Sequence, residues 1–473
     1  MEEIANFLTD IRNEWADASI RENEGDNLLG YVLEKYSTND VEAVLITSHC
    51  LLDVCQGLFI GLPGGWRHYV SKVLRMFDDD DRLDKLMEME LSLMYDILYT
   101  KATVIHTWYG CCIRIIALVA TVAAFFLFQL SNMHGHSRKN IAVSNILLAG
   151  GVFLELISMV RAVGSTWTLV FLYRTKWHWL HGKLHFLRRI FRVATHRRWS
   201  SSVGQYNLLT ACAHGHIVGA APAVEPASMP TNWLLRLAKS KEHYWDRFRH
   251  TKYIMLQDRT KELILKRIHR MHEKGKVIGS LRGLRTLRNL KFDSRIGWTI
   301  QDMAFEDSIM AWHIATDICL GGDGSDQQPA GELVAATTVL SNYMMFLLAF
   351  GRYILPGPVR RRSYMQVRTD LHSFMNKYKS SSPQERLDWA LRKGFHARLL
   401  QSNDPPKQYD IGLRLATVLY HRFDMLDVIF GVWVEMLCYV ANNCSRESHA
   451  TQLSSGGELV TIVWLMARHV ELS

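Results

Sequence analysis

Acidic residues are missing from one long stretch of this chain: no Asp or Glu lies between Glu155 and Glu225. The net charge is +9, and the gap concentrates positive charge in the middle of the chain. A basic surface of this kind favours contact with an anionic membrane face. Nucleic acid is the less favoured partner, because no recognised RNA- or DNA-binding signature accompanies the Arg-rich residues 279–295.

The sequence also lacks a disulfide framework and an apolar leader. Its eight cysteines are scattered, and the N-terminal residues MEEIANFLTDIRNEW are acidic and amphipathic. We therefore expect no cleavable signal peptide and expect reduced thiols in the cytosol. Alternation of apolar and polar residues with a period of two is rare, so the sequence predicts a mainly α fold without a sizeable sheet.

Charge is absent from Ile115 to Leu130, where Thr121 and Gln129 are the polar residues. About 20 apolar residues in a helix are needed to cross a bilayer. The segment reaches that length if it begins near Thr107, and a second apolar segment follows a short polar loop. The sequence thus predicts a transmembrane hairpin within residues 106–175, with spans at about 109–130 and 141–160.

Three polar residues fall in or at the end of the second span: Asn145, Glu155 and Arg161. They are either part of a polar pathway or contacts that hold helices together and reach the interface. We favour the second interpretation, because two helices alone do not provide walls for a pathway.

The two flanks of the hairpin differ in charge. The loop at 131–140 carries Arg138 and Lys139, whereas the residues after the second span are far more basic. The positive-inside rule therefore predicts an integral membrane protein with both termini in the cytosol.

Residues 177–199 are amphipathic and predict a helix lying on anionic lipid headgroups. The alternative is a solvated basic face on a soluble domain. The predicted membrane-surface residues are Lys183, Arg188, Arg189, Arg192, Arg197 and Arg198.

Outside the hairpin the pattern is helical. The sequence predicts amphipathic helices in residues 1–105. In residues 176–230 it predicts the basic helix, followed by a linker over Ser200–Pro230. Residues 231–473 predict a cytosolic all-helical domain. Leu333–Phe350 holds no charge over 18 residues and reaches spanning length. Its polar side chains favour a buried helix of the soluble domain instead.

Thiols and imidazoles near the C-terminus raise the question of a metal or a catalytic site. Cys438, Cys444, His449 and His469 carry groups that bind zinc, but the spacing C-x5-C-x4-H matches no standard zinc pattern. A Cys–His hydrolase is the other chemical alternative, although no orienting partner is identifiable. We favour buried structural residues and expect no cofactor.

Three strings in the C-terminal half carry a family resemblance: WHIATD at 312–317, LSNYMM at 340–345, and HATQLSSGGEL at 449–459. The chain resembles a plant-specific membrane family in which domain of unknown function 4220 precedes domain of unknown function 594. The resemblance spans about Tyr109 to the end and is strongest at Ile309–Pro356 and Trp433–His469.

Typical members of that family begin with further membrane helices and carry Gly-Gly-Gln-Asp and Glu-Asp-Asn strings, neither of which is present here. The resemblance therefore implies a member that lacks its N-terminal portion, from a plant, with no catalytic residues to transfer. We expect a non-enzymatic membrane-anchored scaffold or signalling component in stress or development, with homo-oligomers or other proteins as partners. The alternatives are a transporter or channel subunit and a Cys/His metal-binding or hydrolytic enzyme.

Overall fold

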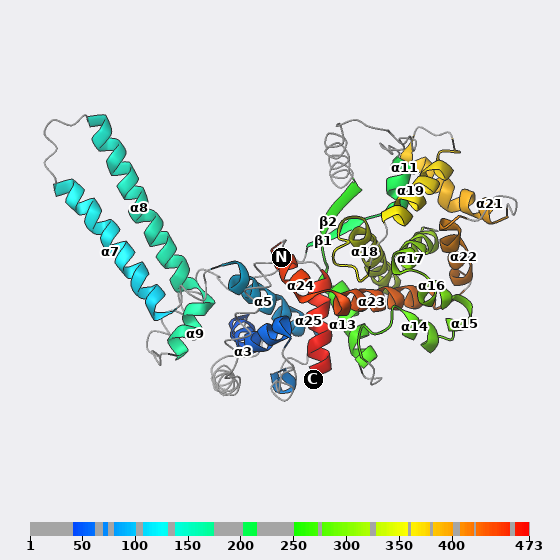
Figure 1. Ribbon diagram of the computed structural model, residues 1–473, viewed down its shortest axis with the longest axis horizontal. Coiled ribbons are helices and arrows are strands. Elements are labelled where there is room, and N and C mark those ends of the chain that lie inside the picture. The colour runs from blue at the N-terminus through cyan, green and yellow to red at the C-terminus, as the bar shows by residue number, and fades with distance from the viewer. Residues whose placement is uncertain are drawn as a thin grey trace, which may run out of the picture. The chain divides into compact units, whose positions relative to one another are not determined.

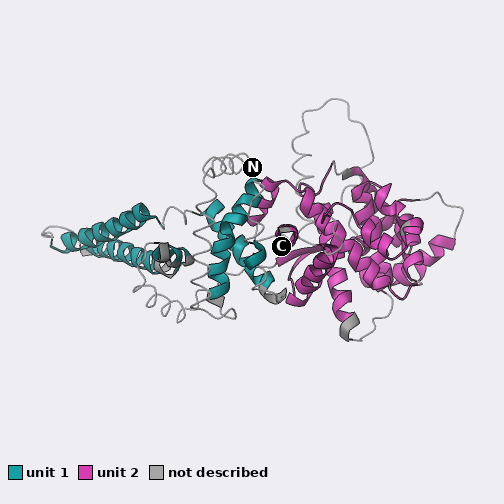
Figure 2. Cartoon of the chain, turned by 90° about the horizontal axis from the view of Figure 1, so that it is seen from below, with its two compact units in different colours: residues 1–199 teal, residues 200–473 magenta. Residues whose placement is uncertain are grey.

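The chain is described by a computed structural model in two compact units, residues 1–199 and residues 200–473 (Figure 2). The residues that the structure describes are 41–61, 70–73, 80–100, 107–130, 138–174, 202–214, 250–272, 277–321, 328–357, 361–378, 382–400, 407–420, 422–454 and 459–472.

Unit 1 is helical in its described residues. Its helices are α3 (Val41–Ile60), α5 (Asp80–Tyr99), α7 (Trp108–Leu130), α8 (Arg138–Gly164) and α9 (Thr166–Arg174) (Figure 1). The helix α5 begins at Asp80, inside a run of four Asp residues in the sequence. Leu86, Met87, Leu93 and Met94 of α5 are fully buried, so its apolar face packs against α3.

The apolar helix α3 is a core helix of unit 1. It is long enough to cross a membrane, yet 83% of its apolar window is buried inside the protein. His49 of α3 meets the ring of Trp167 of α9 edge to face, with 4.9 Å between ring centroids. The indole nitrogen of Trp167 in turn donates to a carboxylate oxygen of Asp96 of α5 at 3.1 Å. These contacts tie α9 to the α3–α5 pair.

The predicted hairpin is present as α7 and α8, which run side by side (Figure 1). With about 1.5 Å of rise per residue, the 23 residues of α7 are about 35 Å long, and a bilayer core is about 30 Å thick. Among the residues of α7 only Gly110 is buried, and the window Ile141–Val160 of α8 contains no buried residue. The hairpin therefore presents nearly all of its apolar surface outward.

Unit 2 consists of many helices and one small sheet. The strands β1 (Ser202–Tyr206) and β2 (Thr251–Met255) are antiparallel, with Ser202 opposite Met255. The helices are α11 (Leu208–His214), α13 (Asp258–His272), α14 (Leu284–Asn289), α15 (Asp293–Ile296), α16 (Trp298–Gln301), α17 (Phe305–Leu320), α18 (Gln328–Phe350), α19 (Arg361–Met375), α20 (Pro383–Trp389), the π-helix η3 (Ala390–Gly394), α21 (Phe395–Leu400), α22 (Tyr409–Tyr420), α23 (Met425–Asn443), α24 (Arg446–Leu453) and α25 (Leu459–Leu472). The mainly α prediction is confirmed.

The core of unit 2 lies where α17, α18 and α23 meet. Trp312, Tyr343 and Trp433 are completely or almost completely buried there. Each polar atom of these large rings has a partner, as buried donors require. The Trp433 indole donates to Thr316 at 3.0 Å, the Trp312 indole donates to Thr299 at 3.2 Å, and the Tyr343 hydroxyl accepts from the amide of Val460 at 3.1 Å.

The helix α18, which carries no charge from Leu333 to Phe350, is a core helix of unit 2, as the polar side chains of that segment predicted. Of its apolar window Gly331–Phe350, 61% is buried, and Leu340, Met344 and Leu347 are fully covered. The helix α23 is also apolar and long enough to span a membrane, with 72% of its window buried. Length and apolarity alone therefore do not separate core helices from membrane helices in this chain.

The linker predicted over Ser200–Pro230 does not begin where we expected. Residues 202–214 form β1 and α11, which belong to unit 2 and pack against α17, α18 and α19. A Cβ added at Gly204 of β1 would lie 2.6 Å from ring carbons of Phe346 in α18. The small residues that suggested a loop instead permit close packing, and the boundary between the units falls at residue 200.

A matched pair of glycines tests the packing of α17 against α22. A Cβ at Gly412 of α22 would lie 2.9 Å from the backbone oxygen of Ala311, whereas a Cβ at Gly331 meets nothing within 4 Å. We expect Gly412→Ala to destabilise the protein by about 1–3 kcal/mol through overpacking. Gly331→Ala should be neutral or stabilising by about 0.5–1 kcal/mol, because alanine favours a helix. Thermal unfolding of the detergent-solubilised full chain, followed by tryptophan fluorescence, measures the stability of both variants. Equal unfolding midpoints for Gly412→Ala and Gly331→Ala would contradict this packing.

Candidate functional site

The interface between α7 and α8, here called the hairpin seam, carries polar pairs toward both ends. The Arg114 guanidinium donates to the backbone oxygen of Ser158 at 3.0 Å and to its hydroxyl at 3.1 Å. At the other end, the amide nitrogen of Gln129 donates to the side-chain oxygen of Asn145 at 2.7 Å. Hydrogen bonds of this kind hold transmembrane helices together. Arg114 and Gln129 are the partners that the sequence analysis did not identify.

The middle of the hairpin seam is made by small residues. A Cβ at Gly151 of α8 would lie 3.6 Å from the Thr121 methyl group of α7, which is ordinary van der Waals contact, so Gly151 faces α7 across the seam. Glu155 is half-buried three residues before Ser158, on the same side of α8. Within the described part of the chain its carboxylate has no hydrogen bond or ion pair. The side chain of Arg161 lies outside the described residues.

The outer face of the hairpin is apolar on both helices. Large side chains are exposed along its whole length: Ile113, Ile116, Val119, Phe126, Leu127, Leu130, Val143, Ile146, Leu147, Phe153, Leu154 and Val160. Isolated exposed apolar residues are normal in soluble proteins, but a continuous surface of this extent marks contact with a membrane or with another protein. The six predicted membrane-surface residues, Lys183, Arg188, Arg189, Arg192, Arg197 and Arg198, lie outside the described residues.

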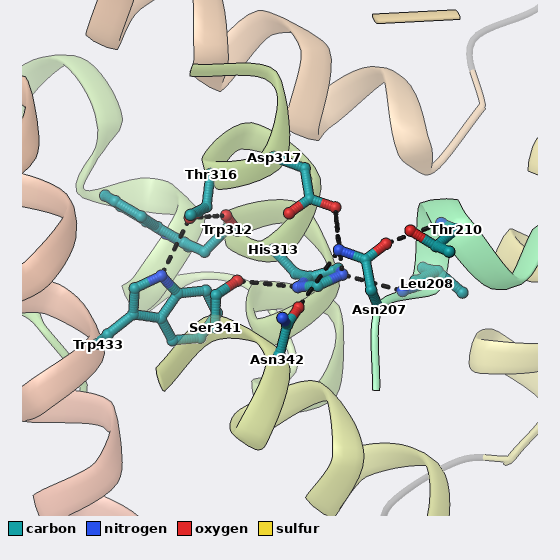
Figure 3. A network of polar contacts seen from close by, with 10 residues as sticks. All are labelled: Asn207, Leu208, Thr210, Trp312, His313, Thr316, Asp317, Ser341, Asn342 and Trp433. Carbon is teal, nitrogen blue, oxygen red and sulfur yellow. Dashed lines mark hydrogen bonds and ion pairs between the residues drawn. The ribbon is translucent and has the colours of Figure 1, made fainter. Parts of the chain in front are cut away.

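In unit 2 the most connected polar group surrounds His313 of α17 (Figure 3). The backbone amide of Leu208 donates to Nε2 of His313 at 3.1 Å, so this nitrogen is unprotonated. Its Nδ1 then carries the hydrogen and donates to the Ser341 hydroxyl of α18 at 2.8 Å. Because the ring is completely buried, its pKa is lowered and the neutral form is favoured.

Asn207 joins this group from the β1–α11 connection (Figure 3). Its amide nitrogen donates to Asp317 at 2.6 Å and to Asn342 at 3.3 Å. Its side-chain oxygen accepts from the backbone amide of Thr210 at 2.7 Å and so caps α11. Burial raises the pKa of Asp317, an effect that His313 and Asn207 oppose.

A serine, a histidine and an aspartate thus lie together, which is the residue set of many hydrolases. The geometry differs from that of a catalytic triad. The imidazole donates to Ser341 and cannot take its proton, and Nε2 lies 3.7 Å from the Asp317 oxygen. Ser341 is also completely buried. The chemistry that this arrangement supports is structural: it attaches β1 and α11 to α17 and α18.

A second buried polar group is centred on Glu435 of α23. Its carboxylate accepts from the Thr286 hydroxyl at 2.6 Å and from the backbone amide of Arg285 at 3.1 Å. Gly283, at the N-cap of α14, provides no side chain for capping, so Glu435 supplies it from another helix. The Arg285 guanidinium donates to the backbone oxygens of Met271 and Val277. Burial raises the pKa of Glu435 and lowers that of Arg267, which donates to Thr286 at 2.9 Å.

The weak metal candidates occupy separate structural positions in unit 2. Cys438 is buried within α23, where burial raises the pKa of its thiol. Cys444 ends that helix, and burial raises its pKa to about 11. His469 of α25 bonds through Nδ1 to the Leu465 backbone oxygen at 2.9 Å. Among the described residues, no group of three or more His, Cys, Asp or Glu is placed to hold a metal ion.

His449, the fourth candidate, has both ring nitrogens engaged. Nε2 donates to the backbone oxygen of Ala441 at 2.9 Å, and Nδ1 accepts from the Thr461 hydroxyl at 3.1 Å. The ring also stacks on Trp464, with centroids 4.7 Å apart. Burial lowers the pKa of His449 from 6.5 to about 4. As a neutral group, His449 thus joins α24 to the C-terminal end of α23 and to the first two turns of α25.

The lowered pKa of His449 makes stability depend on pH. Below pH 6.5 the unfolded chain binds a proton at this residue that the folded chain does not bind until about pH 4. The free energy of unfolding should therefore fall as the pH falls through this window, by up to about 3 kcal/mol. In His449→Gln that contribution disappears, so its stability should change less between pH 6.5 and 4. Urea unfolding of the full chain in detergent measures this, with His396→Gln on the exposed side of α21 as the control. Identical pH profiles for His449→Gln and wild type would contradict the neutral assignment.

Two family matches cover just over half of the chain. The domain of unknown function DUF4220 matches residues 8–212, and the protein of unknown function DUF594 matches residues 421–472. The first match begins well before Tyr109, where the resemblance placed its start, and it ends inside α11. The second includes all of α23, α24 and α25, while the strings in α17 and α18 lie outside both ranges.

No curated protein and no solved structure matches the chain. The order of the two matches is that of the architecture the sequence resembles, and the described residues contain five helices long and apolar enough to cross a membrane. The chain belongs to the family of proteins in which a DUF4220 domain is followed by a DUF594 region.

Proposed function

We propose that this chain is a membrane-anchored scaffold or signalling component, in which the α7–α8 hairpin crosses the bilayer and unit 2 binds other proteins. The observation that carries the proposal is the continuous apolar outer face of the hairpin. At about 25 cal/mol per Å² of apolar surface removed from water, such a face strongly favours lipid over solvent. The helix lengths suit a bilayer core.

The polar chemistry of unit 2 supports a non-enzymatic role. The His313 group, Glu435 and His449 are each engaged in bonds that join helices, and each lies in the interior. Catalytic groups need access to a substrate and a proton that is free to transfer. These three residues are instead bound to backbone and hydroxyl groups of neighbouring elements.

A transporter or channel subunit is the alternative. The pairs Arg114–Ser158 and Gln129–Asn145 favour the anchor, because their polar groups bond to each other across the hairpin seam. Reconstitution separates the two functions. The purified chain in liposomes should give no flux of inorganic ions or small solutes above that of empty liposomes, and a saturable flux would favour the transporter.

The orientation in the membrane is part of the proposal. Residues 174–198 carry more positive charge than the loop at 131–140, which supports cytosolic termini. The same positive charge also suits contact with anionic lipid headgroups. A tag after Ser473 should be digested by protease added to cytosol-side-out vesicles, while a tag inserted in the loop should be protected. The reverse pattern would show the opposite orientation.

Extraction at high pH without detergent tests the anchor. The wild-type chain should remain with the membrane. Val119→Arg and Phe153→Arg place a charge near the middle of an outer face, at a cost of about 2.5–3.5 kcal/mol each, so the double variant should be released in part. Leu130→Arg, at the end of α7, is the control and should remain, because its guanidinium reaches the interface. Release of the wild type would contradict the hairpin anchor.

A scaffold must also hold other proteins. Lysines exposed on unit 2 include Lys252, Lys291 and Lys377. Amine-reactive crosslinking of native membranes, followed by mass spectrometry, should join at least one of these lysines to another protein. Crosslinks confined to this chain would contradict the scaffold.

A further inference from the structure

We propose that Cys111 and Cys112 are sites of S-acylation by a long-chain fatty acid. The inference rests on the proposed function, because it requires the hairpin to be in a membrane. The two cysteines are the fourth and fifth residues of α7, and both are half-buried. They are neighbours in the sequence, so they present two thiols at one end of a membrane-spanning helix. Juxtamembrane cysteines are the usual acceptors of this modification.

The position along α7 places both thiols at a membrane interface. Trp108 and Tyr109, just before them, are 58% and 80% exposed, and such aromatic rings favour the headgroup level. Arg114, just after them, carries the charge nearest to the uncharged run Ile115–Leu130. With Leu130 at one boundary of the hydrocarbon core, Cys112 and Cys111 lie about 27–29 Å away along the helix axis. The core is about 30 Å thick, so the thiols reach the opposite boundary.

The lipid-facing surface next to the cysteines suits an attached acyl chain. Ile115, Ile116 and Val119 are exposed on the following two turns of α7. A chain linked to Cys112 can run along these side chains into the bilayer core. Each methylene that enters lipid contributes about 0.8 kcal/mol, so two acyl chains strengthen the anchor provided by the hairpin.

The reaction is a thioester exchange. A cysteine sulfur attacks the carbonyl carbon of a long-chain acyl-CoA, a new carbon–sulfur bond forms, and the bond to coenzyme A breaks. The proton lost by the cysteine is taken up by the released coenzyme A thiol, and nothing is oxidised or reduced. Acyl-CoA is a cytosolic reactant, so the start of α7 must face the cytosol, as it does when both termini are cytosolic.

The other cysteines are placed differently. Cys50, Cys55, Cys212, Cys319 and Cys438 are buried in the interiors of the two units. Cys444 is half-buried, but it ends α23, a core helix of unit 2, and does not lie at the end of a helix with an exposed apolar face. The geometry therefore selects the pair at the start of α7, and Cys444 provides a matched control.

Acyl exchange on the full chain, expressed in eukaryotic cells, tests the proposal. Free thiols are blocked, thioesters are cleaved with hydroxylamine, and the exposed thiols receive a polymer mass tag. Wild type and Cys444→Ser should show up to two hydroxylamine-dependent mass shifts. Cys111→Ser and Cys112→Ser should each show at most one, and the double variant none. No shift in wild type, or shifts that persist in the double variant, would overturn the proposal.

High-pH extraction of the same samples separates this proposal from the proposed function. The variant that carries both Cys111→Ser and Cys112→Ser should remain with the membrane, because the hairpin still anchors it. Its incorporation of an alkyne-labelled palmitate analogue should disappear. If the wild-type chain stays in the membrane but carries no acyl group, the acylation proposal is wrong and the hairpin anchor is still supported. Wild type that is released contradicts the anchor itself.

Discussion

Apolar surface must be removed from water, and this requirement organises the described part of the chain. Five helices are apolar and long enough to cross a bilayer, but the protein covers only three of them. The helices α3, α18 and α23 find their cover in the interior of a unit. The outer faces of α7 and α8 are not covered by the described residues, and an uncovered apolar hairpin of this length fits a membrane protein.

Covering apolar helices also buries polar groups, and each of these has to be satisfied. In unit 2 this is done between elements that are distant in sequence. His313 accepts from the start of α11, Glu435 caps α14 from α23, and His449 bonds to the backbone of α23. These bonds fix how the helices meet, because removing either partner leaves a buried group without a hydrogen bond. The same principle applies in the hairpin seam, where polar side chains pair across α7 and α8.

The hairpin was predictable because its signal is local. Uncharged runs separated by a short polar loop indicate two spans regardless of what surrounds them, and α7 and α8 follow the predicted limits closely. Ser200–Pro230 was misread in part, because Ser, Gly and Ala indicate both loops and close packing. Only the position of Phe346 against Gly204 distinguishes these two interpretations.

The sequence by itself determined the helical class, the hairpin and the family, because each depends on runs of residues that are adjacent in the chain. Tertiary structure decided which apolar helices form a core and which keep an exposed apolar face, since that depends on residues far away in sequence that pack against them. It also decided that Cys438, Cys444, His449 and His469 serve separate structural positions, and that Asn145 pairs with Gln129. Spacing along a chain does not report distances between helices, so these assignments required the fold.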